Sequence, residues 1–451
     1  MKKVFSLLFA LVMLVSMFSG CTQANTTQPT VLPTDPTDPT EAPEMAIEVG
    51  YARVAISPDF AMPMRGYGDQ AERYSVNGTD PDAPIYTTCI AFKDEKGNMI
   101  LLYHNDTIGC PADPYDRIRQ AIADKTGVPF NRIMTSGTHT HHSIELTLYG
   151  LEEVQKYTKL LEGWMIEAAE AAIADLKPAK MHTARTEELE NLNFIRHYIM
   201  KDGSVAGDNF GNKASGYKEH QSDADSVMQL VKFTREGGKD VILVNWQSHP
   251  HRNASASEKG TYYNTLSSNI VGIMRNVMEA ELDCHFAYFT GASGNVNPLS
   301  KFPYLNITKD YKEQGAALAN AAIAVAPTFK PVKTGELNIM ENIVTANPKK
   351  SGAVVPTIPL YAFSIGEVAF VTAPYEMFDA NGKEIKNGSP YETTFVITCA
   401  NAAVKYIPSY EGFEYNGVIS YGGNATQYER GTGELLVGKF LEMLNALHEK
   451  K

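Results

Sequence analysis

The chain has 451 residues, with 40 Lys and Arg against 52 Asp and Glu, a net charge of −12 and 43% hydrophobic residues. The acidic balance and the lack of a Lys/Arg-rich run exclude a nucleic-acid-binding protein, because binding to phosphates needs a concentrated basic face. Only one apolar stretch approaches membrane length, so a multi-span membrane protein is excluded as well. The composition is that of an ordinary globular protein.

The first residues have the pattern of a secretory signal. A positively charged start precedes an apolar run over Val4–Phe18, and Ser-Gly-Cys21 follows. The run is too short to span a membrane comfortably. The ending resembles the lipobox of bacterial lipoproteins, although Phe18 stands where that motif usually has Leu. We therefore expect residues 1–20 to be a removed signal and Cys21 to carry the lipid that anchors an extracytoplasmic protein to the bacterial cell membrane. An ordinary signal peptide with a chance cysteine is the alternative.

The segment that follows the signal, residues 21–45, is rich in Thr, Pro and Asp and repeats Thr-Asp-Pro. A segment of this composition cannot bury enough apolar surface to fold, so it predicts a disordered, extended stalk. The folded body is expected over residues 46–451.

Four cysteines remain in the body. Their number is even and the predicted compartment permits disulfides, but a body of this size builds a core without them. We expect buried free thiols and no disulfide among Cys89, Cys110, Cys284 and Cys399.

The body alternates β-rich runs with amphipathic helical runs. In chain order, strands are predicted over 86–92, 99–105, 132–136, 227–233, 241–246, 285–289, 360–365, 368–372 and 395–399. Helices are predicted over 113–124, 152–174, 262–281, 309–324, 377–387 and 434–449. Alternation of this kind indicates an α/β core, and the turn at 94–98 indicates antiparallel pairing as well. No repeat or linker divides the body, so we predict a single large α/β domain with mixed β-sheets flanked by helices.

Three histidines lie just after the predicted strand 132–136, in the segment SGTHTHH. Residues beyond the carboxyl end of a strand line the ligand crevice of α/β folds. In an extended His-x-His segment, alternate side chains project to the same side, so His139 and His141 can converge on one ion or on an ion and its substrate. A surface cluster without function is the alternative.

Two further strand ends carry similar signals. The strand 241–246 is followed by His249, and neutral imidazole is a good Zn²⁺ ligand. The strand 285–289 leads into a loop with Gly291 and Gly294, where backbone amides can approach a ligand as an oxyanion-stabilising loop requires. Each signal alone is weak, because single histidines are often structural and glycine-containing loops are common.

Together the three segments, SGTHTH, NWxxH and GxxGNxxP, resemble the neutral/alkaline ceramidase family of secreted zinc amidases, which split the N-acyl bond of ceramide. The resemblance runs from about Gly50 to the end of the chain. It implies that zinc is held by His139, His249, Glu376 and Tyr406. It also implies catalytic roles for His141, Arg196 and, by a loose match, Tyr421. Without the resemblance, Glu376 would be a helix-start carboxylate, Tyr406 a core aromatic and Arg196 part of a surface ion pair.

The chain departs from the family at two points. Asn297 replaces the family's serine, which is important for amide cleavage, and Asn295 replaces an aspartate. An amide cannot act as a nucleophile, but Asn297 can donate a hydrogen bond to an oxyanion. We also expect no counterpart of the β-sandwich domain that typical ceramidases append, and both departures make true ceramide specificity doubtful.

The sequence therefore predicts a surface-anchored zinc-dependent hydrolase that cleaves an amide (N-acyl) or related acyl bond in a small or lipid-like substrate. Zinc lowers the pKa of water toward 7, His141 acts as general base or acid, and Arg196 and Asn297 stabilise the charge that develops on the carbonyl oxygen. A metal- or solute-binding lipoprotein without catalysis is the alternative, and an inactive relative is a third interpretation. The substrate and the oligomeric state stay open.

Overall fold

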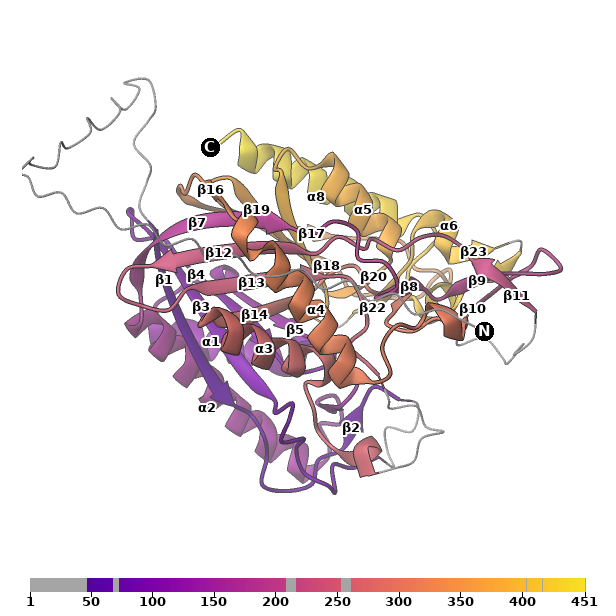
Figure 1. The fold of residues 1–451 in the computed structure, drawn as a ribbon, viewed down its shortest axis with the longest axis horizontal. Coiled ribbons are helices and arrows are strands. Elements are labelled where there is room, and N and C mark those ends of the chain that lie inside the picture. The colour runs from indigo at the N-terminus through magenta and orange to yellow at the C-terminus, as the bar shows by residue number, and fades with distance from the viewer. Residues whose placement is uncertain are drawn as a thin grey trace, which may run out of the picture. The chain divides into compact units, whose positions relative to one another are not determined.

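Two β-sheets packed face to face form the centre of the fold (Figure 1). The computed structural model describes residues 47–67, 73–207, 216–252, 261–402, 404–415 and 417–450, all within one compact unit, Glu44–Lys451. The predicted signal, Cys21 and the predicted stalk lie outside the described residues. In the described part of the chain, no helix combines the length and the apolarity needed to cross a bilayer.

The larger sheet has nine strands and mixed pairing. Its order is β14 (His285–Thr290), β13 (Val241–Trp246), β12 (Gln229–Arg235), β7 (Lys177–Arg185), β1 (Ile47–Ala55), β3 (Tyr86–Asp94), β4 (Met99–Asn105) and β5 (Ile133–Gly137), and β16 (Lys330–Val332) also pairs with β7. The pairs β13/β14 and β4/β5 are parallel, and the other pairs are antiparallel.

The smaller sheet has the order β17 (Leu337–Val344), β18 (Ile358–Ile365), β19 (Val368–Thr372) and β21 (Thr393–Ile397), with β19 and β21 parallel. Its inner face packs on the larger sheet through apolar side chains that are almost fully buried, such as Phe363 and Phe370 against Phe92 and Phe233. Burial of this apolar surface holds the two sheets together.

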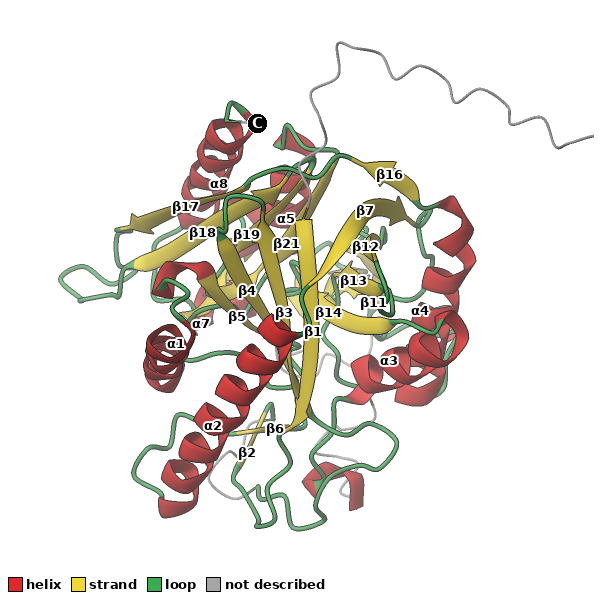
Figure 2. Ribbon diagram, turned by 90° about the vertical axis from the view of Figure 1, so that its left-hand side faces the viewer, coloured by secondary structure: helices red, strands yellow, loops and turns green. Residues whose placement is uncertain are grey.

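Helices cover the outer face of each sheet, so the fold has four layers. On the larger sheet, α1 (Ala112–Thr126) and α2 (Glu152–Ala174) cover one half, and α3 (Asn269–Leu282) and α4 (Tyr311–Val325) cover the other. On the smaller sheet, α5 (Asp379–Gly388) and α8 (Thr432–His448) provide the cover. Figure 2 shows α2 beside β1, α3 and α4 on the opposite side, and α8 next to the smaller sheet.

Short elements connect these layers around the site. They are β2 (Met64–Arg65), β6 (Ser143–Ile144), β8 (Phe194–Ile195), β9 (His197–Met200), β10 (Val205–Gly207), β11 (Tyr217–His220), β15 (Val296–Asn297), β20 (Tyr375–Met377), β22 (Val404–Ile407), α6 (Tyr410–Phe413), β23 (Glu414–Tyr415), β24 (Val418–Ile419) and α7 (Tyr421–Ala425).

The predicted fold class, a large α/β domain with mixed sheets flanked by helices, is confirmed. The predicted bounds agree with α2, β4, β13 and β19. The helix expected over 262–281 is wrong at its start, since α3 begins at Asn269. Ser267 and Ser268 direct their hydroxyls to Asp80 and to the carbonyl of Ala83, and such local polar bonding competes with helix formation.

The larger sheet is strongly curved at its middle. Strands β1 and β7 pair only through Ile47–Val49, and the two halves of the sheet diverge from there. Beyond this point, β14 lies against β4, and the backbone N–H of Tyr288 in β14 donates to Nδ1 of His104 in β4 at 2.8 Å. The ends of β5, β13 and β14 therefore lie near one another. The four cysteines of the body, Cys89, Cys110, Cys284 and Cys399, are buried free thiols.

Candidate metal centre

His139 lies just beyond β5 in a left-handed backbone conformation, with φ of 66°. Its backbone N–H donates to the carbonyl of Thr107, and its Nδ1 lies 2.7 Å from the carbonyl oxygen of Ile108. A carbonyl only accepts hydrogen bonds, so Nδ1 carries the proton and Nε2 has the free lone pair in the neutral ring. The side chain is 3% exposed.

His249, which follows β13, is held in the same way. Its backbone N–H and its Nδ1 both contact the carbonyl oxygen of Val296, at 3.1 and 3.0 Å. Its Nε2 is therefore also a lone-pair donor in the neutral ring. A backbone carbonyl on one ring nitrogen is the arrangement that orients histidines toward metals in proteins.

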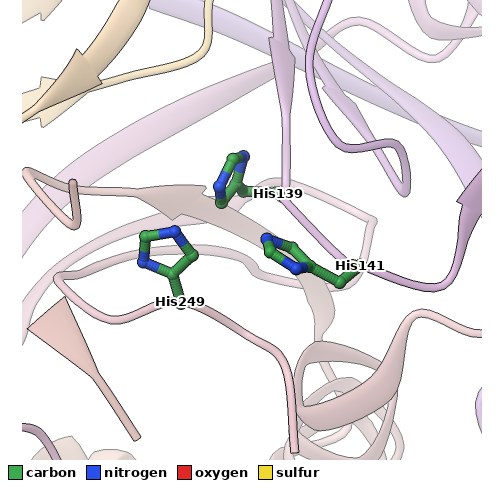
Figure 3. Close-up of side chains that lie close together, drawn as sticks. All are labelled: His139, His141 and His249. Atoms are coloured by element: carbon green, nitrogen blue, oxygen red, sulfur yellow. The ribbon is translucent and has the colours of Figure 1, made fainter. Parts of the chain in front are cut away.

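Glu376 completes this group. Its Oε2 lies 3.3 Å from Nε2 of His139 and 3.3 Å from Nε2 of His249. His141 adds a third imidazole, and Figure 3 shows the three rings pointing toward one another. One ring nitrogen of each of His139, His141 and His249 falls within 4.8 Å of the others.

The charges of these side chains follow from burial and mutual contact. Burial raises the pKa of Glu376, but His139 and His249 beside it lower that pKa more, to well below its usual range. Burial and the neighbouring histidines hold the pKa of His141 well below its usual value. Burial also lowers the pKa of His249, to about 4, against the opposing effect of Glu376. At neutral pH the group therefore contains a carboxylate and at least two neutral imidazoles.

This donor set fits a divalent cation. The two Nε2 atoms and Oε2 of Glu376 are buried and have no hydrogen-bonding partner among the described residues. Burial lowers the pKa of His139, but Cys399 and Glu376 beside it raise that pKa more, to well above its usual value. Two ring nitrogens and a carboxylate oxygen thus converge where a positive charge is favoured, and a divalent cation can take the place of the proton on His139. Nitrogen and carboxylate ligands with one position left open are typical of catalytic zinc sites.

Tyr406, Arg196 and Tyr421 lie beside this centre. Tyr406 in β22 is the register partner of Glu376 in β20, and its hydroxyl hydrogen-bonds to Glu376. Burial, followed by the charge of Glu376, raises the pKa of Tyr406 well above its usual value, so the phenol is protonated. The guanidinium of Arg196 is 5.3 Å from the ring of Tyr406 and 5.2 Å from that of Tyr421, within cation–π range. Arg196 is 4% exposed and therefore lies in the interior, so the surface ion pair considered as its alternative is wrong.

The loop after β14 differs from the sequence-based expectation. The amide of Gly291 donates to the carbonyl of Trp246, and that of Gly294 donates to the carbonyl of Met377, so neither is directed at a ligand. Oδ1 of Asn295 accepts from the first N–H of α5, at Asp379, and Asn297 pairs its backbone with Phe194. Through these bonds the loop contacts the Glu376 segment, and the amides of Gly291 and Gly294 are not available to a ligand.

A cavity of about 330 Å³ opens onto the centre. His139, His141, Glu376, Tyr406 and Tyr421 line it, whereas His249, Arg196 and Asn297 are not among its lining residues. Its other walls include the apolar side chains of Ile108, Pro111, Ile144, Leu146 and Ala425. Five of the eight residues predicted for the site thus face one space, with His249 and Arg196 packed behind it.

Neither a family model nor a curated protein matches the sequence. Among solved structures, a ceramidase complexed with C2 matches with a TM-score of 0.69 and 16% identity, over 90% of this chain and 76% of the other. Neutral ceramidase from Pseudomonas aeruginosa matches with the same TM-score and identity, over 90% of this chain and 75% of the other. The chain has the neutral ceramidase fold. This confirms the ceramidase-like fold that the three strand-end motifs predicted.

Two residues that contact the site, Cys399 and Tyr67, are missing from the site residues predicted from the sequence. Sγ of Cys399 lies 3.4 Å from Nδ1 of His139, and Cys399 lines the cavity. The ring of Tyr67 stands edge-on to that of His141, with centroids 5.2 Å apart. Cys399 was assigned to a strand, but β21 ends at Ile397 and Cys399 has φ of 53°, which leaves its side chain beside the site.

Proposed function

We propose that this protein is a zinc-dependent hydrolase that cleaves an amide (N-acyl) or related acyl bond in a lipid-like substrate. The observation that carries the proposal is the convergence of Nε2 of His139, Nε2 of His249 and Oε2 of Glu376 at the wall of a cavity. The fold shared with a ceramidase complexed with C2 supports a substrate of the N-acyl class. True ceramidase activity is not part of the proposal, because Asn297 stands where the family has its serine.

The reaction adds water across the acyl bond. For an amide, the C–N bond breaks, a C–O bond forms, and both protons of the water end on the leaving nitrogen, so the products are a carboxylate and an ammonium. Zinc bound at the centre supplies Lewis acidity, which lowers the pKa of water and polarises the carbonyl. His141 lines the cavity and is neutral at pH 7, so its imidazole accepts the proton from water and returns it to the amine.

Two residues act through their neighbours. Arg196 is outside the cavity lining but hydrogen-bonds to Tyr406. Tyr406 in turn hydrogen-bonds to Glu376. We assign Arg196 the positioning of Tyr406, and Tyr406 the positioning of Glu376, with a direct contact of Tyr406 to zinc as its further predicted role. Asn297, outside the cavity, has no catalytic role in this proposal.

Metal analysis combined with turnover tests the proposal. Mature protein is analysed for metal and incubated with N-acyl amides and esters, and the released acid is measured. We expect about one zinc per chain and hydrolysis that stops on chelation and returns with zinc. His139→Ala is expected to lose both zinc and turnover, while His448→Ala on the exposed end of α8 retains both. Full zinc and activity in pure His139→Ala protein would place the site elsewhere. Reversible metal or solute capture without turnover would instead support a binding lipoprotein.

We also propose that Cys21 anchors the protein outside the bacterial cell membrane. The signal-like segment and the Ser-Gly-Cys sequence support this. In a bacterial host, wild type should incorporate labelled palmitate and fractionate with membranes, whereas Cys21→Ser should do neither. Equal labelling of the two proteins would contradict the anchor.

A further inference from the structure

The cavity wall carries two cations and two carboxylates besides its histidines. The cations are Arg65 and Lys405, and the carboxylates are Glu145 and Glu376. Both carboxylates already have partners within the protein. Glu376 faces two histidines, and Glu145 is fully buried and paired with Arg65 at 3.2 Å. The charge of Lys405 is therefore unopposed within the lining.

Lys405 lies in β22, directly before Tyr406, and its side chain is exposed. No hydrogen bond or ion pair joins it to any of the described residues. Some other lysines are paired, as Lys93 is with Glu48 at 2.6 Å and Lys96 with Glu336 at 2.7 Å, but what sets Lys405 apart is its place in the cavity wall. In a chain of net charge −12, an unpaired ammonium at a cavity wall is available for a ligand.

Arg65 offers further donors from another part of the wall. Its Nη1 contacts Glu145 and Thr147, but Nε and Nη2 make no hydrogen bond within the described part of the chain, and the side chain is 31% exposed. The next residue, Gly66, packs so closely on His141 that a Cβ there would lie 2.5 Å from the Cα of His141. Arg65 is thus one residue from a direct backbone contact with His141.

We propose that the polar end of the substrate carries an anionic oxygen group, a carboxylate or a phosphate, which Lys405 binds with support from Arg65. This inference rests on the proposed hydrolase function and narrows its substrate class to anionic N-acyl compounds. The cavity size agrees with it, since about 330 Å³ is near the lower end of the ~300–1,000 Å³ typical of ligand pockets. A pocket of this size encloses the polar end and the scissile bond and leaves a long acyl chain to extend outward.

Three conjugates that share one acyl chain test the proposal. N-dodecanoylglycine and N-dodecanoylethanolamine differ mainly in a carboxylate against a hydroxymethyl group, and N-dodecanoyl-O-phosphoethanolamine supplies the phosphate. With wild-type mature protein, we expect kcat/KM to be at least tenfold higher for an anionic conjugate than for the ethanolamine conjugate. Whichever anionic conjugate has the higher kcat/KM shows whether the subsite prefers a carboxylate or a phosphate. Its KM should rise with ionic strength, because salt screens exposed charges.

Lys405→Gln removes the charge with little change in size. We expect it to lower the ratio of anionic to neutral kcat/KM about tenfold, mainly through KM. The matched control is Lys330→Gln, an exposed lysine on the edge strand β16 outside the cavity lining, which should leave the ratio unchanged. Arg65→Gln is not the primary test, because it leaves the buried carboxylate of Glu145 unpaired.

The outcomes separate this inference from the proposed function. Equal kcat/KM for the three conjugates, or an unchanged ratio in Lys405→Gln, overturns the anion subsite and leaves the hydrolase intact. If no conjugate is hydrolysed, the affinities of the three conjugates for wild-type protein, measured by calorimetry, test the anion subsite. Preferential binding of an anionic conjugate that Lys405→Gln abolishes supports the subsite while the hydrolase proposal fails. Lack of such a preference overturns both.

Discussion

The carbonyl oxygen of Ile108 lies 2.7 Å from Nδ1 of His139. This contact selects the tautomer of His139 and directs Nε2 toward Glu376. The loop that carries Ile108 begins at Asp106, whose carboxylate contacts Arg275 at 2.9 Å, His104 at 3.2 Å and the backbone N–H of Tyr86 at 3.0 Å. The candidate metal centre is thus supported by a buried charge network.

Replacement of Asp106 tests this support. Asp106→Asn leaves the guanidinium of Arg275, which is 1% exposed, without a counter-charge. We expect a loss of about 3–5 kcal/mol in the free energy of unfolding, as for other broken buried ion pairs, measured by urea denaturation. The control Asp113→Asn removes an exposed pair with Arg117 and should change stability little. Equal effects of the two substitutions would contradict a structural role for Asp106.

The same carboxylate predicts a dependence of stability on pH. Burial raises the pKa of Asp106, but Arg275 and His104 lower it further, so the folded pKa lies below the usual value of 3.8. A depressed folded pKa contributes stability that is fully present above the unfolded pKa and lost as pH falls through the folded pKa. The free energy of unfolding should therefore decrease below about pH 4 in wild type, and less steeply in Asp106→Asn. Parallel pH profiles for the two proteins would exclude Asp106 as a source of this effect.

Gly294 permits the close approach of the loop after β14 to the Glu376 segment. A Cβ at this position would lie 2.8 Å from the carbonyl oxygens of Glu376 and Met377. We expect Gly294→Ala to displace Glu376, to weaken zinc binding and to cost about 1–3 kcal/mol of stability. The control is Gly163→Ala inside α2, where a Cβ meets nothing within 4 Å and alanine favours the helix. Unchanged zinc affinity in Gly294→Ala would show that this contact does not position the ligand.

Tyr406→Phe separates a metal ligand from a positioning residue. The substitution removes the hydroxyl that bonds Glu376 and Arg196 and keeps the buried ring. If Tyr406 acts by positioning, zinc content stays near that of wild type while kcat falls. Loss of zinc together with activity would instead identify Tyr406 as a required ligand. Metal analysis and steady-state kinetics on one preparation distinguish these results.

Local sequence patterns account for much of the fold. The apolar spacing of α2 predicts its bounds, because Val154, Leu161 and Met165 recur on one buried face. Strands β7 and β17 were not predicted, for a physical reason. Strands β7 and β17 contain many partly exposed polar residues, so their apolar pattern is weak, and they become strands through pairing with neighbours.

The sequence alone determined the ends of the strands and the chemistry placed there: two histidine-bearing segments after β5 and β13, and an acidic residue after β19. It did not determine that they meet. Five antiparallel strand pairs and one parallel pair separate β5 from β13 in the sheet, so the two strands run in opposite directions. In a flat sheet, His139 and His249 would therefore lie at opposite ends of the strands. The tertiary structure decides the outcome. Because β1 and β7 share only three paired residues, the sheet diverges and curves back until the rings of His139 and His249 are 4.7 Å apart. Strand patterns encode side-chain chemistry locally, whereas curvature arises from how the layers pack, and only packing brought the ligands together.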